Sequence, residues 1–107
     1  MPADPETYLH SLTTLYLRLP ETPHRLSRFD HRLARDLCAR QIPFAVIESA
    51  FLLASARRAV RPPTAPPLGP IRSLHYFLPV IEELLKNPLP NSYLPYLRRK
   101  VSLRHLP

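Results

Sequence analysis

The stretch PFAVIESAFLLASARRAV, residues 43–60, decides the fold expected for this chain. It begins with a proline, which the first turn of a helix tolerates, and Glu48 is its only charged residue before Arg57. Apolar residues occupy nearly every side of its helical period, and such a helix is buried by neighbours on several sides. We therefore expect residues 43–60 to form the buried central helix of the fold.

Prolines mark the ends of the other expected elements, since the chain holds fifteen prolines and one glycine. The segments between them repeat apolar residues at helical spacing, and no stretch alternates for long enough to form a strand. Helices are expected over residues 4–19, 27–40 and 73–86, and a last short helix after Asn91. The prediction is therefore all-α: a compact bundle of four to five helices that forms a single domain over residues 1–107.

Two of these helices have clear start signals. Asp4 offers a side-chain acceptor, and Pro5 supplies a first residue whose missing N–H breaks no helical bond. Ser27 can cap the next helix, with Asp30 in its first turn favoured by the helix dipole. Both helices are therefore expected to begin at these residues.

The segment 27–40 is amphipathic. Phe29, Leu33 and Leu37 recur at four-residue steps and are predicted to face the core. A different side of this helix carries its bases: Arg28, Arg32 and Arg35. The helix is therefore expected to present arginines to solvent.

Two stretches are expected outside the helices. Residues 61–71 form a proline-rich connector that is either a stiff link between helices or a PxxP ligand, and the stiff link is favoured. Residues 98–107 form a basic tail that is expected to fray. Within the segment 73–86, Pro79 leaves two alternatives: a kinked helix, or a separate turn followed by a helix that begins at the proline.

The chain is strongly basic, with a net charge of +7 and thirteen arginines among its fifteen basic residues. The bases form three blocks, at residues 18–40, 57–72 and 98–104, and the last two blocks contain no acid. Such blocks are typical of proteins that bind polyanions. The alternative is that the arginines reflect the codon bias of a GC-rich genome, which explains their clustering less well.

The candidate nucleic-acid contacts follow from these blocks. The bases predicted to neutralise phosphates are Arg28, Arg32, Arg35, Arg57, Arg58, Arg61, Arg72, Arg98, Arg99, Lys100 and Arg104. Tyr93 and Tyr96 lie beside the last block, and aromatic residues among bases are typical of single-strand binding by stacking. A helix-turn-helix is disfavoured, because the early exposed positions of its recognition helix, around Val46, offer few donors for base edges.

Nothing in the chain assembles a convincing active site, so it is expected not to be an enzyme and to have no small-molecule substrate. The possible metal ligands are scattered along the chain: His24, His31, Cys38, His75 and His105. No metal site and no other cofactor is therefore expected. Glu82 and Glu83 are adjacent and diverge on a helix, and the lone Gly69 cannot form a phosphate-cradling loop. Glu48, isolated in an apolar helix, is expected to pair with an arginine.

Cysteine content, the first residues and hydropathy indicate the compartment. Cys38 is the single cysteine, so no internal disulfide is possible. Residues 1–17 carry two acids and no lysine or arginine, unlike the charged start of a secretory signal. No apolar run approaches the roughly 18 residues that span a bilayer. These features predict a cytoplasmic protein that does not contact membranes.

The stretch PIRSLHYFLPVIEELL, residues 70–85, resembles the closing helix of replication-associated proteins of bacterial mobile elements. It is also distantly similar to the end of DnaD-like replication domains. The resemblance is carried by Arg72, Ser73 and Tyr76, with Val80 and Leu84 at the following four-residue steps. The chain departs from the pattern at Leu84, where an aromatic residue is expected, and at Pro79, which breaks the helix. The resemblance implies DNA binding during replication or element mobilisation.

The leading prediction is a non-catalytic, low-specificity DNA-binding accessory protein of a bacterial replication or mobile-element system, with DNA favoured over RNA. Low specificity is expected because no set of side chains suits the reading of base edges. The alternative is a helical protein-interaction subunit or adaptor that docks on a larger assembly or forms a homo-oligomer. The alternative is motivated by a surplus of apolar residues: Leu68, Leu89, Leu94 and Leu106.

Overall fold

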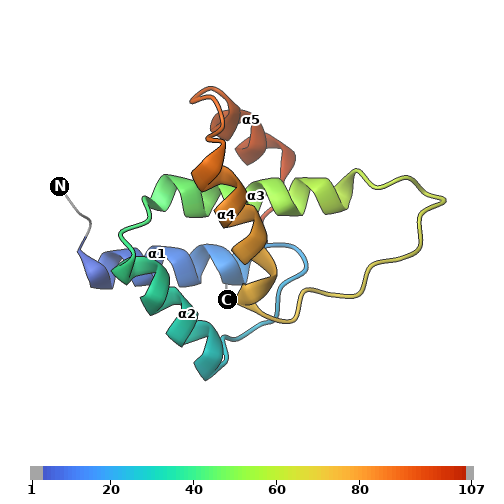
Figure 1. The fold of residues 1–107 in the computed structure, drawn as a ribbon. Coiled ribbons are helices and arrows are strands. Elements are labelled where there is room, and N and C mark those ends of the chain that lie inside the picture. The colour runs from blue at the N-terminus through green and yellow to red at the C-terminus, as the bar shows by residue number, and fades with distance from the viewer. Residues whose placement is uncertain (1–3, 106–107) are drawn as a thin grey trace.

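The computed structural model of the chain describes residues 4–105. Its helical elements are, in chain order, α1 (Pro5–Arg18), α2 (Arg28–Ala39), α3 (Phe44–Ala59), the 3-10 turn η1 (Leu74–Phe77), α4 (Leu78–Lys86) and α5 (Tyr93–Lys100) (Figure 1). No residue from 4 to 105 is in a strand, so the all-α prediction is confirmed. None of the helices in this range is long and apolar enough to span a bilayer.

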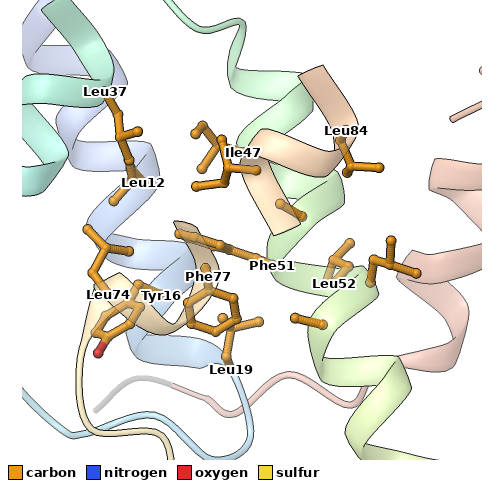
Figure 2. Close-up of a cluster of buried hydrophobic side chains, with 14 of the residues drawn as sticks. Leu12, Tyr16, Leu19, Leu37, Ile47, Phe51, Leu52, Leu74, Phe77 and Leu84 are labelled. Atoms are coloured by element: carbon orange, nitrogen blue, oxygen red, sulfur yellow. The ribbon is translucent and has the colours of Figure 1, made fainter. Parts of the chain in front are cut away.

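α3 is the centre of the fold. It packs against α1, α4, α5 and η1, and Figure 1 shows these elements arranged around it. Its buried residues lie on all sides of the helix: Ile47, Ala50, Phe51, Leu52, Leu53, Ala54 and Ser55. The ring centroid of Phe51 lies 4.8 Å from that of Phe77 in η1 and 6.2 Å from that of Tyr16 in α1 (Figure 2). The predicted buried central helix is therefore confirmed.

The predicted helix starts are confirmed at both capping residues. Asp4 accepts a hydrogen bond from the Thr7 N–H at 3.1 Å, and Pro5 is the first helical residue of α1. At the start of α2, the Ser27 hydroxyl accepts from the Asp30 N–H, and an Asp30 carboxylate oxygen accepts from the Ser27 N–H, both at 3.1 Å. This reciprocal capping box satisfies donors that the first turn would otherwise leave unpaired.

The buried face of α2 differs from the predicted one. Phe29, predicted to face the core, is 58% exposed, whereas Asp30 is 1% exposed. Leu33 and Leu37 are buried as predicted. The Asp30 carboxylate accepts the Leu74 N–H at 2.9 Å, and a buried carboxylate is stable only with such partners. The prediction for Phe29 is wrong because this hydrogen bond turns the Asp30 side of the helix inward.

The segment around Pro79 follows the second of the two predicted alternatives. η1 forms a separate turn, and α4 begins at Leu78. Pro79 therefore lies in the first turn of α4, where its missing N–H removes no helical hydrogen bond. α5 begins at Tyr93 with Ser92 rather than Asn91 at its N-cap position, and no side-chain hydrogen bond caps it.

The proline-rich connector leaves the end of α3 as an extended loop and returns to η1 (Figure 1). Two arginines hold its backbone: Arg58 in the last turn of α3 and Arg61 in the connector itself. The Arg58 guanidinium donates to the Gly69 carbonyl at 2.6 Å, and that of Arg61 donates to the Pro66 carbonyl at 2.7 Å. The first bond attaches the loop to the end of α3, and the second closes a turn within the loop itself.

The basic tail differs from the frayed segment that the sequence predicts. Residues 98–100 belong to α5. The Arg104 guanidinium then donates to the backbone carbonyls of Leu17 and Thr22, both at 2.8 Å. These bonds fix the tail to the end of α1, because two otherwise unsatisfied carbonyls find a charged donor there. Residues 106 and 107 lie outside the described part of the chain.

Candidate nucleic-acid interface

One face of α2 carries three arginines: Arg28, Arg32 and Arg35. All three are exposed, and none of them forms an ion pair within residues 4–105. With about 100° of rotation per residue, their side chains leave the helix within an arc of about 60°. This arc lies opposite the buried side of the helix, where Leu37 packs into the core. We call these three residues the arginine face.

The buried carboxylate of Asp30 sets how the arginine face is turned. One of its oxygens accepts the Ser27 N–H, and the other accepts the Leu74 N–H of η1. Because Asp30 points inward, Arg28 leaves the helix about 160° away and points to solvent. The same contact places the segment with the exposed Arg72 beside the start of α2.

An aromatic ring and an acid border the arginine face. The Arg28 guanidinium lies over the exposed ring of Phe29, 5.3 Å from its centroid. Asp36 is exposed on the same helix, about 40° around the axis from Arg32. The carboxylate of Asp36 lowers the positive potential along one border of the face, since surface charges at such distances still interact.

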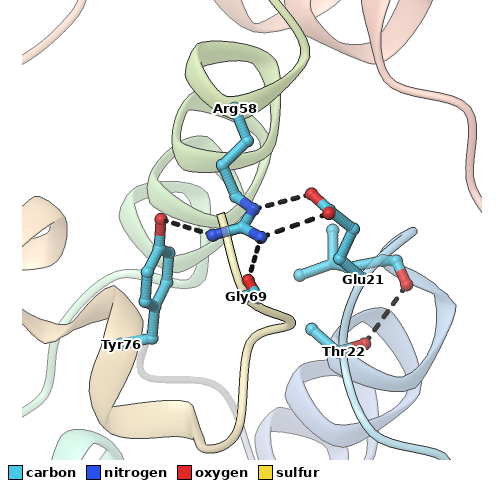
Figure 3. A network of polar contacts seen from close by, with 6 residues as sticks. Glu21, Thr22, Arg58, Gly69 and Tyr76 are labelled. Carbon is cyan, nitrogen blue, oxygen red and sulfur yellow. Dashed lines mark hydrogen bonds and ion pairs between the residues drawn. The ribbon is translucent and has the colours of Figure 1, made fainter. Parts of the chain in front are cut away.

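Arg58, in the second block of bases, is engaged inside the fold. Its side chain is 5% exposed and donates to both carboxylate oxygens of Glu21, at 2.6 and 3.1 Å (Figure 3). It also donates to the Gly69 carbonyl at 2.6 Å and to the Tyr76 hydroxyl at 3.1 Å. The hydrogen bonds with Arg58 lower the pKa of the Glu21 carboxyl, although partial burial opposes this. The guanidinium is therefore occupied by protein acceptors.

Three further arginines pair with acids on neighbouring elements: Arg40 with Glu82, Arg57 with Glu83, and Arg98 with Glu48. The Arg57 and Arg98 pairs are bidentate, with N–O distances of 2.7 to 3.0 Å. The expected pairing of Glu48 with an arginine is confirmed. Hydrogen bonds from the arginines lower the pKa of the Glu82 and Glu83 carboxyls. Exposed pairs of this kind contribute little stability, but they direct these guanidiniums toward protein acceptors.

The predicted phosphate contacts therefore divide into two sets. Of the bases predicted to contact phosphate, those that bind no protein acceptor within residues 4–105 are Arg28, Arg32, Arg35, Arg72, Arg99 and Lys100. The others bind carboxylates or carbonyls. Arg61, for example, binds a carbonyl of the connector, and Arg104 binds a carbonyl of α1. Figure 1 shows α2 and α5 on opposite sides of α3, so Arg99 and Lys100 lie apart from the arginine face.

The predicted stacking residues lie in a groove between α3 and α5. The ring centroids of Tyr93 and Tyr96 are 5.3 Å apart, and the ring planes meet at 40°. The Lys100 ammonium lies 5.4 Å from the Tyr96 centroid. The groove has a volume of about 270 Å³, and its lining includes Leu53 of α3 and Val60, the residue after α3.

Two acids that the sequence does not single out as site residues position the arginines. Asp30 has a signal in the sequence, because it precedes Leu33 and Leu37 at helical spacing and so belongs to the buried stripe. Glu21 has no local signal, since its partner Arg58 is 37 residues away. Contacts between residues far apart in the sequence therefore determine that Arg58 is bound by protein acceptors while the arginine face is exposed.

Within residues 4–105, no group of three or more histidine, cysteine, aspartate or glutamate side chains is arranged to hold a metal ion. A comparison with known proteins finds no matching family model, curated protein or solved structure. The function proposed for this chain therefore depends on the geometry of its own residues and on the local resemblance at residues 70–85.

Proposed function

We propose that this chain is a non-catalytic, low-specificity DNA-binding accessory protein of a bacterial replication or mobile-element system and acts in the cytoplasm. The observation that carries the proposal is the arginine face of α2. Its three guanidiniums share one exposed side of a helix, and they bind no acid in the part of the chain that the structure describes. Such an array suits the phosphates of a nucleic-acid backbone.

The spacing of the arginine face supports contacts with separate phosphates. Arg28 and Arg35 are seven residues apart, which corresponds to about 10 Å along the helix axis. Contacts with phosphate position a protein on DNA but carry no sequence information. The neighbouring exposed residues, His31 and Ala39, lack the side-chain amide that recognises adenine edges. These features support binding of low specificity.

The role in replication or mobilisation rests on the resemblance at residues 70–85. Of the residues that carry it, Tyr76 accepts a hydrogen bond from Arg58. Arg72 is exposed, and it precedes by two residues Leu74, whose N–H binds Asp30 near the start of α2. In this proposal Arg72 acts as a further phosphate contact near the start of α2.

Fluorescence anisotropy with labelled single- and double-stranded oligonucleotides tests the proposal. The triple variant Arg28→Ala/Arg32→Ala/Arg35→Ala is expected to bind DNA at least about tenfold more weakly at low salt. The slope of log K against log salt is expected to fall by about 2.7, since each phosphate contact contributes about 0.9 on double-stranded DNA. Folding should be retained, because all three side chains are exposed.

A matched control separates the arginine face from the net charge of the protein. The variant Arg40→Ala/Arg57→Ala/Arg98→Ala removes the same number of charges from residues that are paired with acids. It is expected to keep most of the affinity. Equal losses in the two triple variants would show that binding follows overall charge, and no binding by the unmodified chain at low salt would overturn the proposal.

A further inference from the structure

The groove between α3 and α5 exposes apolar surface on a side of the molecule away from the arginine face. Val60 is 79% exposed at its α3 wall, and Tyr93 and Tyr96 are 37% and 41% exposed on α5. Its floor is formed by buried residues, including Leu53 and Leu97. Tyrosine rings beside such a floor are typical of the core of a protein interface, where aromatic residues are enriched.

The charged residues that line this groove have one sign. Arg57 and Lys100 line it, and no acid does. Arg57 is paired with Glu83, whereas Lys100 and the adjacent Arg99 bind no carboxylate within residues 4–105. An occupant that places carboxylates beside the last turn of α5 would therefore gain favourable electrostatics.

We propose that this groove docks an acidic amphipathic segment of a partner protein, with apolar side chains against Val60 and the two tyrosines and carboxylates beside Arg99 and Lys100. The size of the groove, about 270 Å³, suits a few side chains of a peptide. The segment would bind as an amphipathic helix binds a hydrophobic groove, through apolar anchors at helical spacing. This docking is independent of DNA binding at α2.

Contacts within the groove favour a peptide over a nucleobase. One neighbour of the Tyr96 ring is Tyr93, and another is the Lys100 ammonium. These neighbours leave less of the Tyr96 ring face for a stacked base, whereas a side chain can contact Val60 and the exposed parts of the two rings. A second copy of this chain is disfavoured as well, because a two-fold contact through the groove would bring like charges together.

Titration of the isotope-labelled full chain, followed by amide chemical shifts, tests the proposal. The probe is a synthetic helical peptide of about 15 residues with leucine and phenylalanine on one face and glutamates beside them. The expected result is shifts in the second half of α3 and in α5. A matched peptide with lysine in place of glutamate is expected to bind at least about tenfold more weakly.

Two variants tie the shifts to the groove. Val60→Asp is expected to weaken binding of the acidic peptide about tenfold, since it places a like charge and a polar group at an apolar contact. Leu68→Asp adds the same charge on the exposed connector and is expected to change little. The variant Arg99→Glu/Lys100→Glu is expected to reverse the preference between the acidic and the lysine peptide.

Three results would overturn the inference. The first is equal binding of the acidic and lysine peptides, and the second is a response of the groove to single-stranded DNA but to neither peptide. The third is a concentration-dependent dimer in analytical ultracentrifugation that Val60→Asp abolishes. Each result would rule out a groove that selects an acidic segment, and none bears on the DNA-binding test at the arginine face.

Discussion

The arginine face of α2 and the arginines at the end of α3 are alike in sequence and differ in the fold. Both sets place three arginines within eight residues on or beside a helix. On α2 the guanidiniums point to solvent without acid partners, whereas Arg58 binds Glu21, Gly69 and Tyr76. The difference teaches that the guanidiniums of a basic block stay available to a ligand only where the fold brings no acceptors to them.

The largest expected difference between the two regions is in stability. Arg58→Ala is expected to lower the free energy of unfolding by about 2 to 3 kcal/mol, because it removes hydrogen bonds made by a charged and nearly buried group. Arg32→Ala, on the exposed face, is expected to change it by less than about 0.5 kcal/mol. Urea denaturation followed by circular dichroism measures both values. Equal destabilisation would contradict the contrast.

The next effect is a dependence of stability on pH that Arg58 controls. The pKa of Glu21 is lower in the folded chain than its usual value of 4.5, so the unfolded state binds the proton first as the pH falls. The stabilisation that ionised Glu21 contributes through Arg58 is therefore present above about pH 4.5. It is lost as the pH falls through the pKa of Glu21 in the folded chain. Glu82 and Glu83 contribute in the same direction.

A series of urea denaturations from about pH 7 to about pH 3 measures this dependence. Arg58→Ala is expected to flatten the decline, because it removes the hydrogen bonds that lower the pKa of Glu21. The effect is smaller than the loss of the whole Arg58 side chain, since protonation of Glu21 leaves the bonds to Gly69 and Tyr76 in place. Parallel curves for the variant and the unmodified chain would refute this origin.

The smallest expected effect concerns Asp36, the acid that borders the arginine face. If the proposed DNA binding holds, Asp36→Asn is expected to tighten it about twofold at low salt, because the change removes a negative charge from beside the arginine face. The gain should vanish at high salt, where such exposed charges are screened. Anisotropy titrations measure it, and Glu6→Gln, which removes an acid from the first turn of α1, serves as the control. The same gain in both variants would mean that net charge alone matters.

The sequence predicts the features of this fold that depend on local contacts. The caps at Asp4 and Ser27 and the buried helix at residues 43–60 follow from residue preferences and helical period, and the structure confirms them. Phe29 is the instructive failure, since an aromatic residue in an apolar stripe is exposed while an acid is buried. The sequence shows that Asp30 can cap α2, but it does not show that Asp30 also binds Leu74 of η1.

The candidate interface is predictable only in part for the same reason. The positions of the bases are evident from the sequence, and so is their grouping on one side of the helix at residues 27–40. The sequence does not show which arginines remain available to a ligand. That depends on contacts such as Arg57 with Glu83 and Arg98 with Glu48, whose partners are separated by 26 and 50 positions in the chain. No local pattern reports such pairings, because the tertiary fold creates them.

The contact between Arg104 and the end of α1 also has a kinetic consequence. It joins Arg104 to Thr22 and Leu17, which lie 82 and 87 positions earlier in the chain. The hydrogen bonds within each helix, in contrast, join near neighbours. Bringing such distant residues together costs chain entropy, and a higher mean separation of contacting residues slows folding. We therefore expect the attachment of the tail to belong to the late stages of folding, after the helices between its two ends have assembled.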